Sequence, residues 1–127
     1  MQTVLIADDD PLLRHMLRQV FTMAGLRVIE AANGEQAIRS AVADGPDVAV
    51  IDLIMPVVDG IEAIGFLRTK MPTLKILAIS GGGRARHLDI LSLARRMGAD
   101  VVLEKPFSNQ KIVEIVLALC AADVLVE

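Results

Sequence analysis

The amino-acid sequence predicts an α/β protein built on a doubly wound parallel sheet, and three observations lead to this prediction. Short, continuous apolar runs alternate along the chain with longer segments in which apolar residues recur at helical spacing. Three of the runs are nearly free of polar residues, which is typical of strands that helices cover on both faces. Residues that begin and end helices punctuate the segments between the runs. The alternation predicts five strands joined by right-handed crossovers, with five flanking helices.

Each strand is expected where an apolar run lies. The third and fourth runs are wholly apolar, and the first stands directly before three successive aspartates. The second is the shortest, so its limits are the least defined by the pattern. In chain order, the expected strands are Val4–Ala7, Val28–Ile29, Val48–Ile51, Ile76–Ile79 and Val101–Leu103.

Each helix is expected between a capping residue and a residue that breaks the helix. In the first, Asp10 is the N-cap, Pro11 takes the first helical position, and Gly25 ends the helix after an apolar face. The others are expected from Glu35 to Ala43 after the capping pair Asn33 and Gln36, from the capping pair Asp59 and Glu62 to Pro72, from Leu88 to Met97, and after the cap Ser108.

Length and composition indicate one cytoplasmic domain. The 127 residues are enough for a single core, 54% are hydrophobic, and 23% are charged, which excludes a disordered chain. The net charge of −3 supplies no basic stripe, so direct DNA binding is not expected. The single cysteine, Cys120, cannot form an internal disulfide, and no apolar run approaches the roughly 18 residues of a membrane span. We therefore expect residues 1–127 to form one domain without an output domain.

Polar side chains gather where the expected strands end. In open parallel sheets, ligands bind beyond the carboxyl ends of the strands. Four of the five ends carry polar residues, and only the second, followed by Ala31 and Ala32, does not. In the order 2-1-3-4-5 of flavodoxin-like sheets, the second strand is an edge and the other four ends are neighbours, so the pattern favours that order. The four ends carry Asp8, Asp9 and Asp10, then Asp52, then Ser80, and then Lys105.

These residue types point to phosphoryl chemistry. Asp8, Asp9 and Asp52 would converge, and three close carboxylates do not all stay ionised without a cation. Mg²⁺ fits best, because it takes one or two carboxylates, several waters and phosphate oxygens. Lys105 adds a mobile positive charge and Ser80 a hydroxyl donor. A carboxylate nucleophile in such surroundings is typical of a phosphoryl-acceptor site, with Asp52 as the attacking group.

The whole chain resembles the receiver domains of bacterial response regulators. No single motif carries the resemblance, but the order and spacing of several together are highly specific. They are the pair Asp8-Asp9 after Leu5-Ile6-Ala7, Asp52 after Val48–Ile51, Met55-Pro56, Asp59-Gly60, Ser80 at the end of the fourth strand, and Lys105-Pro106-Phe107.

The resemblance implies a role for each site residue. Asp52 would be phosphorylated by a histidine kinase or a histidine phosphotransfer protein. Asp9 and Asp52 would ligate Mg²⁺ directly, Asp8 mostly through a water, and Ile54 through its backbone carbonyl. Ser80 and Lys105 would bind the phosphoryl oxygens, and the Lys105-Pro106 peptide would be cis. The modification would switch a protein-binding surface around the fourth helix, the fifth strand and the fifth helix.

Several positions depart from the common pattern of the family. Val102 stands where many receivers carry an aromatic switch residue. Ile54, at a position that is often polar in the family, and Gly82 would flank the attacking water during dephosphorylation, and neither side chain can orient that water. The interval from Ser80 to Lys105 is a few residues longer than usual, and the glycine-rich segment 81–87 is expected to report the phosphorylation state.

The last helix is predicted to be apolar on nearly all sides. Between Ile112 and Ala122 only Glu114 is charged, which predicts a second buried face and leaves a homodimer or another partner open.

A phosphatase with an aspartyl intermediate is disfavoured because Ile54 replaces a second aspartate. A dinucleotide site is disfavoured because aspartates replace the glycines after the first strand. A receiver-like binding module that is never phosphorylated stays open as the alternative.

Overall fold

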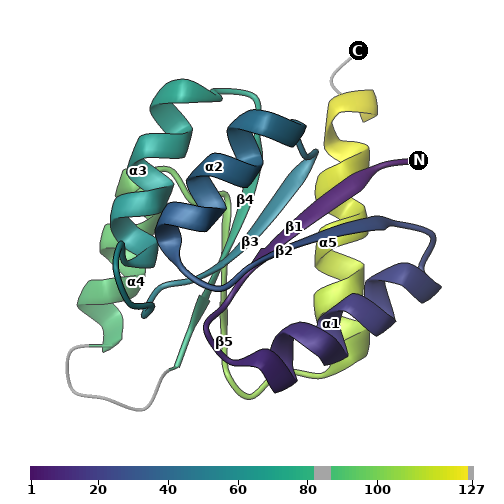
Figure 1. The fold of residues 1–127 in the computed structure, drawn as a ribbon, viewed down its shortest axis with the longest axis horizontal. Coiled ribbons are helices and arrows are strands. Elements are labelled where there is room, and N and C mark those ends of the chain that lie inside the picture. Colours follow the sequence, from purple (N-terminus) through teal and green to yellow (C-terminus); the bar gives the residue numbers. More distant parts are fainter. Residues whose placement is uncertain (82–86, 126–127) are drawn as a thin grey trace.

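The computed structural model describes the backbone of residues 1–81 and 87–125, in which five strands alternate with five helices (Figure 1). The fourth and fifth helices begin within one residue of their predicted starts. The segment 81–87, which is expected to report the phosphorylation state, lies largely outside the described residues. The elements are β1 (Thr3–Ala7), α1 (Pro11–Met23), β2 (Arg27–Ala31), α2 (Gly34–Asp44), β3 (Val48–Asp52), α3 (Gly60–Lys70), β4 (Lys75–Ser80), α4 (His87–Met97), β5 (Val101–Glu104) and α5 (Asn109–Leu125).

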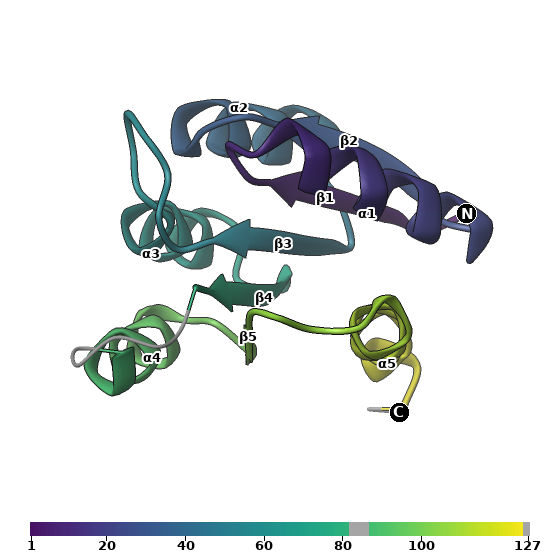
Figure 2. The ribbon, with the colours of Figure 1, turned by 90° about the horizontal axis from the view of Figure 1, so that it is seen from below.

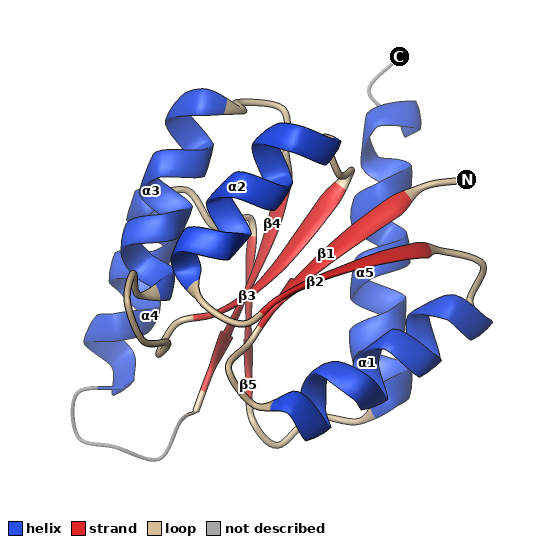
Figure 3. Ribbon diagram, viewed as in Figure 1, coloured by secondary structure: helices blue, strands red, loops and turns tan. Residues whose placement is uncertain are grey.

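The strands form one parallel sheet in the order β2-β1-β3-β4-β5, which confirms the predicted winding (Figure 3). The register sets the ends of the strands against one another: Ala7 pairs with Ile51, Asp52 with Ile79, and Ser80 with Glu104. The residues that follow β1, β3, β4 and β5 therefore meet at one edge of the sheet, as parallel strands require.

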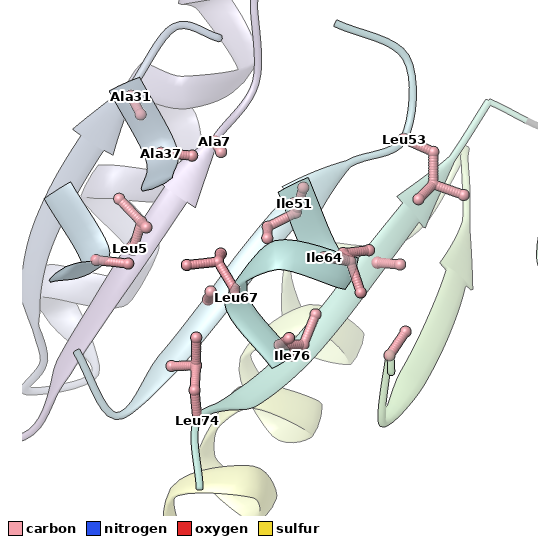
Figure 4. Packing of buried hydrophobic residues seen from close by; sticks show 14 of the residues in the cluster. Leu5, Ala7, Ala31, Ala37, Ile51, Leu53, Ile64, Leu67, Leu74 and Ile76 are labelled. Carbon is pink, nitrogen blue, oxygen red and sulfur yellow. The ribbon is translucent and has the colours of Figure 1, made fainter. Parts of the chain in front are cut away.

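Helices cover both faces of the sheet and enclose two core layers. Figure 2 shows α2, α3 and α4 on one face and α1 and α5 on the other. In the first layer, Leu5 and Ile51 of the sheet pack with Ile64 and Leu67 of α3 (Figure 4). The second layer joins the other side of the sheet to side chains of α1 and α5: Leu17, Phe21, Ile112, Val116 and Cys120. Burial on both faces explains why β1, β3 and β4 are almost continuous apolar runs.

The strand β2 is longer than its apolar run predicted. It spans Arg27 to Ala31, whereas the run covers only Val28 and Ile29. As an edge strand it is only partly buried, so it carries Arg27 and Glu30 without interrupting the ladder with β1. The apolar pattern does not show the full length of such a strand, because backbone hydrogen bonds to the neighbouring strand form with any side chain and extend past the apolar residues.

The predicted helix caps are confirmed. Asp10 accepts from the Leu12 amide at 2.9 Å, and Ser108 accepts from Lys111 at 3.0 Å. The amides of Gln36 and Glu62 donate in the same way to Asn33 and Asp59, at 2.9 Å and 2.8 Å. The Ala32 amide, one residue before the N-cap, donates to Oε1 of the Gln36 side chain at 2.8 Å. These caps fix where each helix starts, and therefore how the preceding loop leaves the sheet.

The last helix has one stripe buried by this chain and an exposed apolar side, so the second buried face, which the sequence predicts together with a dimer or another partner, stays a prediction. Ile112, Val116 and Cys120 pack on the sheet, and Leu117 is exposed. The α5 sequence is apolar almost all round, but only one side of the helix packs on the sheet. Cys120 is a free, buried cysteine. Among the described residues, no helix combines the length and the apolar content that a bilayer crossing requires.

Candidate functional site

Four strand ends bring five of the predicted side chains to one edge of the sheet. Asp8 and Asp9 follow β1, Asp52 is the last residue of β3, Ser80 is the last of β4, and Lys105 comes directly after β5. Asp8, Asp52 and Ser80 are buried, while Asp9 is exposed. The register described above places them together, because each strand ends beside its neighbour.

The three carboxylates form a compact cluster. Asp8, Asp9 and Asp52 each offer one oxygen, and these oxygens lie within 4.8 Å of one another. Asp8 is 1% exposed and Asp52 6%, so two of the negative charges are largely removed from water. Such an arrangement is costly unless a cation or a proton offsets it.

Lys105 supplies one positive charge to the cluster. Its Nζ donates to Asp52 Oδ2 at 3.0 Å and lies 3.7 Å from Asp8 Oδ2. Partial burial by itself lowers the pKa of Lys105, but the hydrogen bond and charge of Asp52, with the charge of Asp8, raise it above the ordinary value overall. The backbone amide of Lys105 donates to the Ser80 carbonyl at 2.8 Å, which ties the lysine to the end of β4.

Asp8 indicates that the cluster suits a cation. Asp8 Oδ1 accepts from the Asp10 amide at 2.8 Å, whereas Asp8 Oδ2 has no hydrogen-bond partner within the described part of the chain. Burial, together with the nearby charge of Asp52, raises the pKa of Asp8 to about 6. A buried oxygen without a hydrogen bond, in a set of three carboxylates, has the donor chemistry that Mg²⁺ prefers.

The segment after β3 holds Asp52 through its backbone. The Ile54 amide donates to Asp52 Oδ1 at 2.9 Å, so both carboxylate oxygens of Asp52 have partners. At Gly60 an added Cβ would lie 2.1 Å from the Asp52 carbonyl oxygen, so the start of α3 packs directly on the acceptor backbone. The Ile54 side chain is 69% exposed beside this site. The Lys105-Pro106 peptide is cis, as predicted.

Sequence reasoning missed three features beside the site. Arg14 of α1 donates to the Asp8 carbonyl at 2.6 Å and also pairs with Glu30 of β2. Val57, between Asp52 and α3, has a φ of 69°, a left-handed conformation that β-branched residues rarely adopt. The only signal for the first two was the charged residue Glu30, directly after the short apolar run of the edge strand, and no residue pattern indicates the third.

Fold and site together define a doubly wound α/β protein whose ligand-binding edge is acidic and carries one lysine. The chain belongs to the response regulator receiver domain family, since the sequence model of that domain matches residues 4–117. Receiver domains are signalling modules of two-component systems, and this assignment confirms the resemblance recognised in the sequence.

Relatives of known name agree with the assignment. The chain is 35% identical over 112 residues to the chemotaxis protein CheY of Thermotoga maritima, covering 87% of this chain and 91% of that protein. It is 36% identical over 111 residues to the C4-dicarboxylate transport transcriptional regulatory protein DctD of Pseudomonas aeruginosa, covering 87% of this chain. Only 23% of DctD is matched, so the chain spans about a quarter of that relative's length.

A solved structure shows the same fold. The CheY-like response regulator receiver domain protein from Methanospirillum hungatei superposes with a TM-score of 0.93, at 20% identity, over 100% of this chain and 99% of the other. At that level of identity the likeness bears on the fold alone, and it matches the observed sheet order and the five flanking helices.

Proposed function

We propose that this receiver domain accepts a phosphoryl group on Asp52, from a phosphohistidine of a histidine kinase or a histidine phosphotransfer protein, with Mg²⁺ bound beside it. The observation that carries the proposal is the pairing of Lys105 with Asp52 inside the cluster of three carboxylates. A lysine and a metal-binding carboxylate set around one aspartate form the environment that phosphoryl transfer needs.

The residues present fit Mg²⁺. The carboxylates of Asp8, Asp9 and Asp52 would hold the ion, with the backbone carbonyl of Ile54 as a further ligand. The orphaned oxygen Asp8 Oδ2 supports this assignment, because it is buried and lacks a hydrogen bond among the described residues. When bound, Mg²⁺ offsets negative charge on the oxygens of the transferring phosphoryl group.

The transfer itself requires few groups from the protein. A carboxylate oxygen of Asp52 attacks phosphorus, a P–O bond forms, and the P–N bond of the donor histidine breaks. The electron pair of that bond stays on the imidazole nitrogen, which is then free to take a proton from water. Lys105 Nζ, which bonds Asp52 in the resting site, moves its hydrogen bond to a phosphoryl oxygen, and the Ser80 hydroxyl binds another.

Phosphorylation would then be read by a partner protein. The added charge at Asp52 biases the conformation of the surface formed by α4, β5 and α5. This surface adjoins the site because Lys105 directly follows β5. Val102 is half-buried against the core layer under α4, where many receivers use an aromatic residue. A cytoplasmic location belongs to the same proposal.

Intact-mass measurement tests the proposal. The protein is incubated with Mg²⁺ and phosphoramidate, and a mass gain of one phosphoryl group is expected that disappears with a chelator. Asp52→Ala should take up nothing, while Asp44→Ala, which removes an exposed aspartate at the end of α2, should behave like the unaltered chain. No mass gain with phosphoramidate or with phosphorylated kinases would instead support a binding module that is never phosphorylated.

A further inference from the structure

Asp8 is fixed at three of its four polar groups. Its amide donates to the Ala31 carbonyl at 3.1 Å, its Oδ1 accepts from the Asp10 amide, and its carbonyl accepts from Arg14 Nη1 at 2.6 Å. The fourth group, Oδ2, is the one without a hydrogen bond among the described residues. The bonds therefore orient the residue so that a single oxygen is presented to the cluster.

Arg14 makes the one bond of this set that comes from a side chain. It lies in α1, and its side chain is 18% exposed. While Nη1 contacts the Asp8 carbonyl, Nε pairs with Glu30 Oε1 at 3.2 Å. Glu30 lies opposite Ile6 in the register of β2 and β1, so it is held by the sheet. The planar guanidinium thus bridges the edge strand β2 and the turn after β1.

The bonded carbonyl belongs to the peptide that joins Asp8 to Asp9. A charge-assisted hydrogen bond to that carbonyl opposes rotation of the peptide plane, which sets ψ of Asp8 and φ of Asp9 and so the path of the turn that carries both carboxylates. Hydrogen bonds of this kind, made to the residues that ligate a metal, orient those ligands in protein metal sites.

We propose that Arg14, held by Glu30, is a positioning residue that sets the orientation of Asp8 and Asp9 toward the metal. This inference rests on the proposed function, since it assumes that the cluster binds Mg²⁺. Through Glu30, the edge strand β2 takes part in the site, although none of its residues belongs to the carboxylate cluster.

A charge effect and a positioning effect have opposite signs here. Arg14 is a cation near an acidic site, so removing its charge strengthens Mg²⁺ attraction if charge is all that matters. Removing the bond to the Asp8 carbonyl frees the turn and weakens Mg²⁺ binding. The sign of the change in affinity therefore separates the two roles.

Arg18 provides the matched control. It lies one helical turn further along α1 and pairs with the same Glu30, but its other contact is the Val28 carbonyl of β2, at 3.4 Å. Arg14→Gln and Arg18→Gln therefore remove the same charge and the same kind of ion pair. Only the first removes the bond to the turn that carries Asp8 and Asp9.

The test is calorimetric titration of the folded chain with MgCl₂ at pH 7.5. Arg14→Gln should bind Mg²⁺ about tenfold more weakly, the lower end of the range for side chains that hydrogen-bond metal ligands. Arg18→Gln should change the affinity less than about twofold, and Arg14→Lys, which keeps the charge but has a single nitrogen, should fall between. In NMR spectra, the Asp9 amide nitrogen should shift in Arg14→Gln and not in Arg18→Gln, because it shares the peptide whose carbonyl loses its bond.

Unchanged or tighter Mg²⁺ binding in Arg14→Gln would overturn the inference, as would equal weakening in both variants. If Arg14→Gln does not fold, Arg14→Lys gives the comparison without a change of charge: weaker Mg²⁺ binding than the unaltered chain supports the inference, and unchanged binding overturns it. A wild-type chain that binds no Mg²⁺ would overturn the proposed function and this inference together. A wild-type chain that binds Mg²⁺ and takes up phosphoryl groups, with Arg14→Gln indistinguishable from it, would overturn this inference alone.

Discussion

Lys105 reaches across β4 to donate to Asp52 Oδ2 at 3.0 Å, although β5 and β3 are not neighbours in the sheet. The side chain is long enough to pass the end of the intervening strand, and there it also approaches Asp8. One ammonium group therefore stands between two buried carboxylates, and the electrostatics of the site depend on it.

Replacement of Lys105 should separate metal binding from phosphoryl uptake. Lys105→Met removes a positive charge from a low-dielectric site, so Mg²⁺ should bind more tightly. Uptake from phosphoramidate should slow by roughly 100-fold, because a donor to the transferring group is lost. Calorimetry and intact mass measure the two effects. Lys111→Met, at an exposed position in the first turn of α5, should alter neither, and weaker Mg²⁺ binding in Lys105→Met would contradict the account.

Asp8 should make the metal-free protein less stable as the pH rises. Its folded-state pKa of about 6 exceeds the ordinary 3.8, so between these values the native state binds a proton more readily than the unfolded state. The stability that protonation gives is present below about pH 4 and is lost as the pH rises through about 6. At pH 7, Asp8→Asn should therefore raise the free energy of unfolding by up to about 3 kcal/mol.

Urea unfolding followed by circular dichroism in EDTA measures this effect, because the chain has no tryptophan or tyrosine. The advantage of Asp8→Asn should shrink from pH 7 to pH 4.5, and Asp44→Asn should show no such trend. An advantage that is constant with pH would mean that the carboxylate of Asp8 is not the source.

Gly60 should not tolerate a side chain. The Cβ of Gly60→Ala would lie 2.1 Å from the Asp52 carbonyl oxygen and 2.5 Å from the Leu53 Cα, and backbone atoms cannot move aside cheaply. We expect a loss of about 3 kcal/mol in the free energy of unfolding, with slower phosphoryl uptake because Asp52 is displaced. Gly81→Ala is the control, since an added Cβ there meets no atom of the described residues within 4 Å. Equal stability of the two variants would contradict the packing described.

Val57 should be a position where glycine stabilises the protein. Its φ of 69° is costly for a β-branched residue, and its side chain is 74% exposed, so little packing is lost on removal. Val57→Gly should raise the free energy of unfolding by about 1 kcal/mol. Val58→Gly should lower it, because Val58 is partly buried and has no positive φ. Chemical unfolding of the two variants side by side tests both signs.

Much of the fold and of the site could be predicted from the pattern of residues. Continuous apolar runs mark β1, β3 and β4 because helices cover both faces of those strands, and side-chain caps such as Asp10 and Ser108 mark helix starts because they satisfy exposed amides. Asp8, Asp52, Ser80 and Lys105 were identified because each follows a recognisable strand, and parallel strands end at a common edge.

The sequence by itself therefore determined the order of the strands, the class of protein and the residues that surround Asp52. Only the tertiary structure decided how those residues are held. The bridge from Glu30 through Arg14 to the Asp8 carbonyl joins β2, α1 and the turn after β1, and Glu30 lies outside the short apolar run that marks the edge strand. The exposed apolar side of α5 and the left-handed Val57 are likewise outcomes of packing and chain closure. Periodicity reports which side chains avoid water, whereas hydrogen-bond geometry and backbone strain depend on where the whole chain places each group.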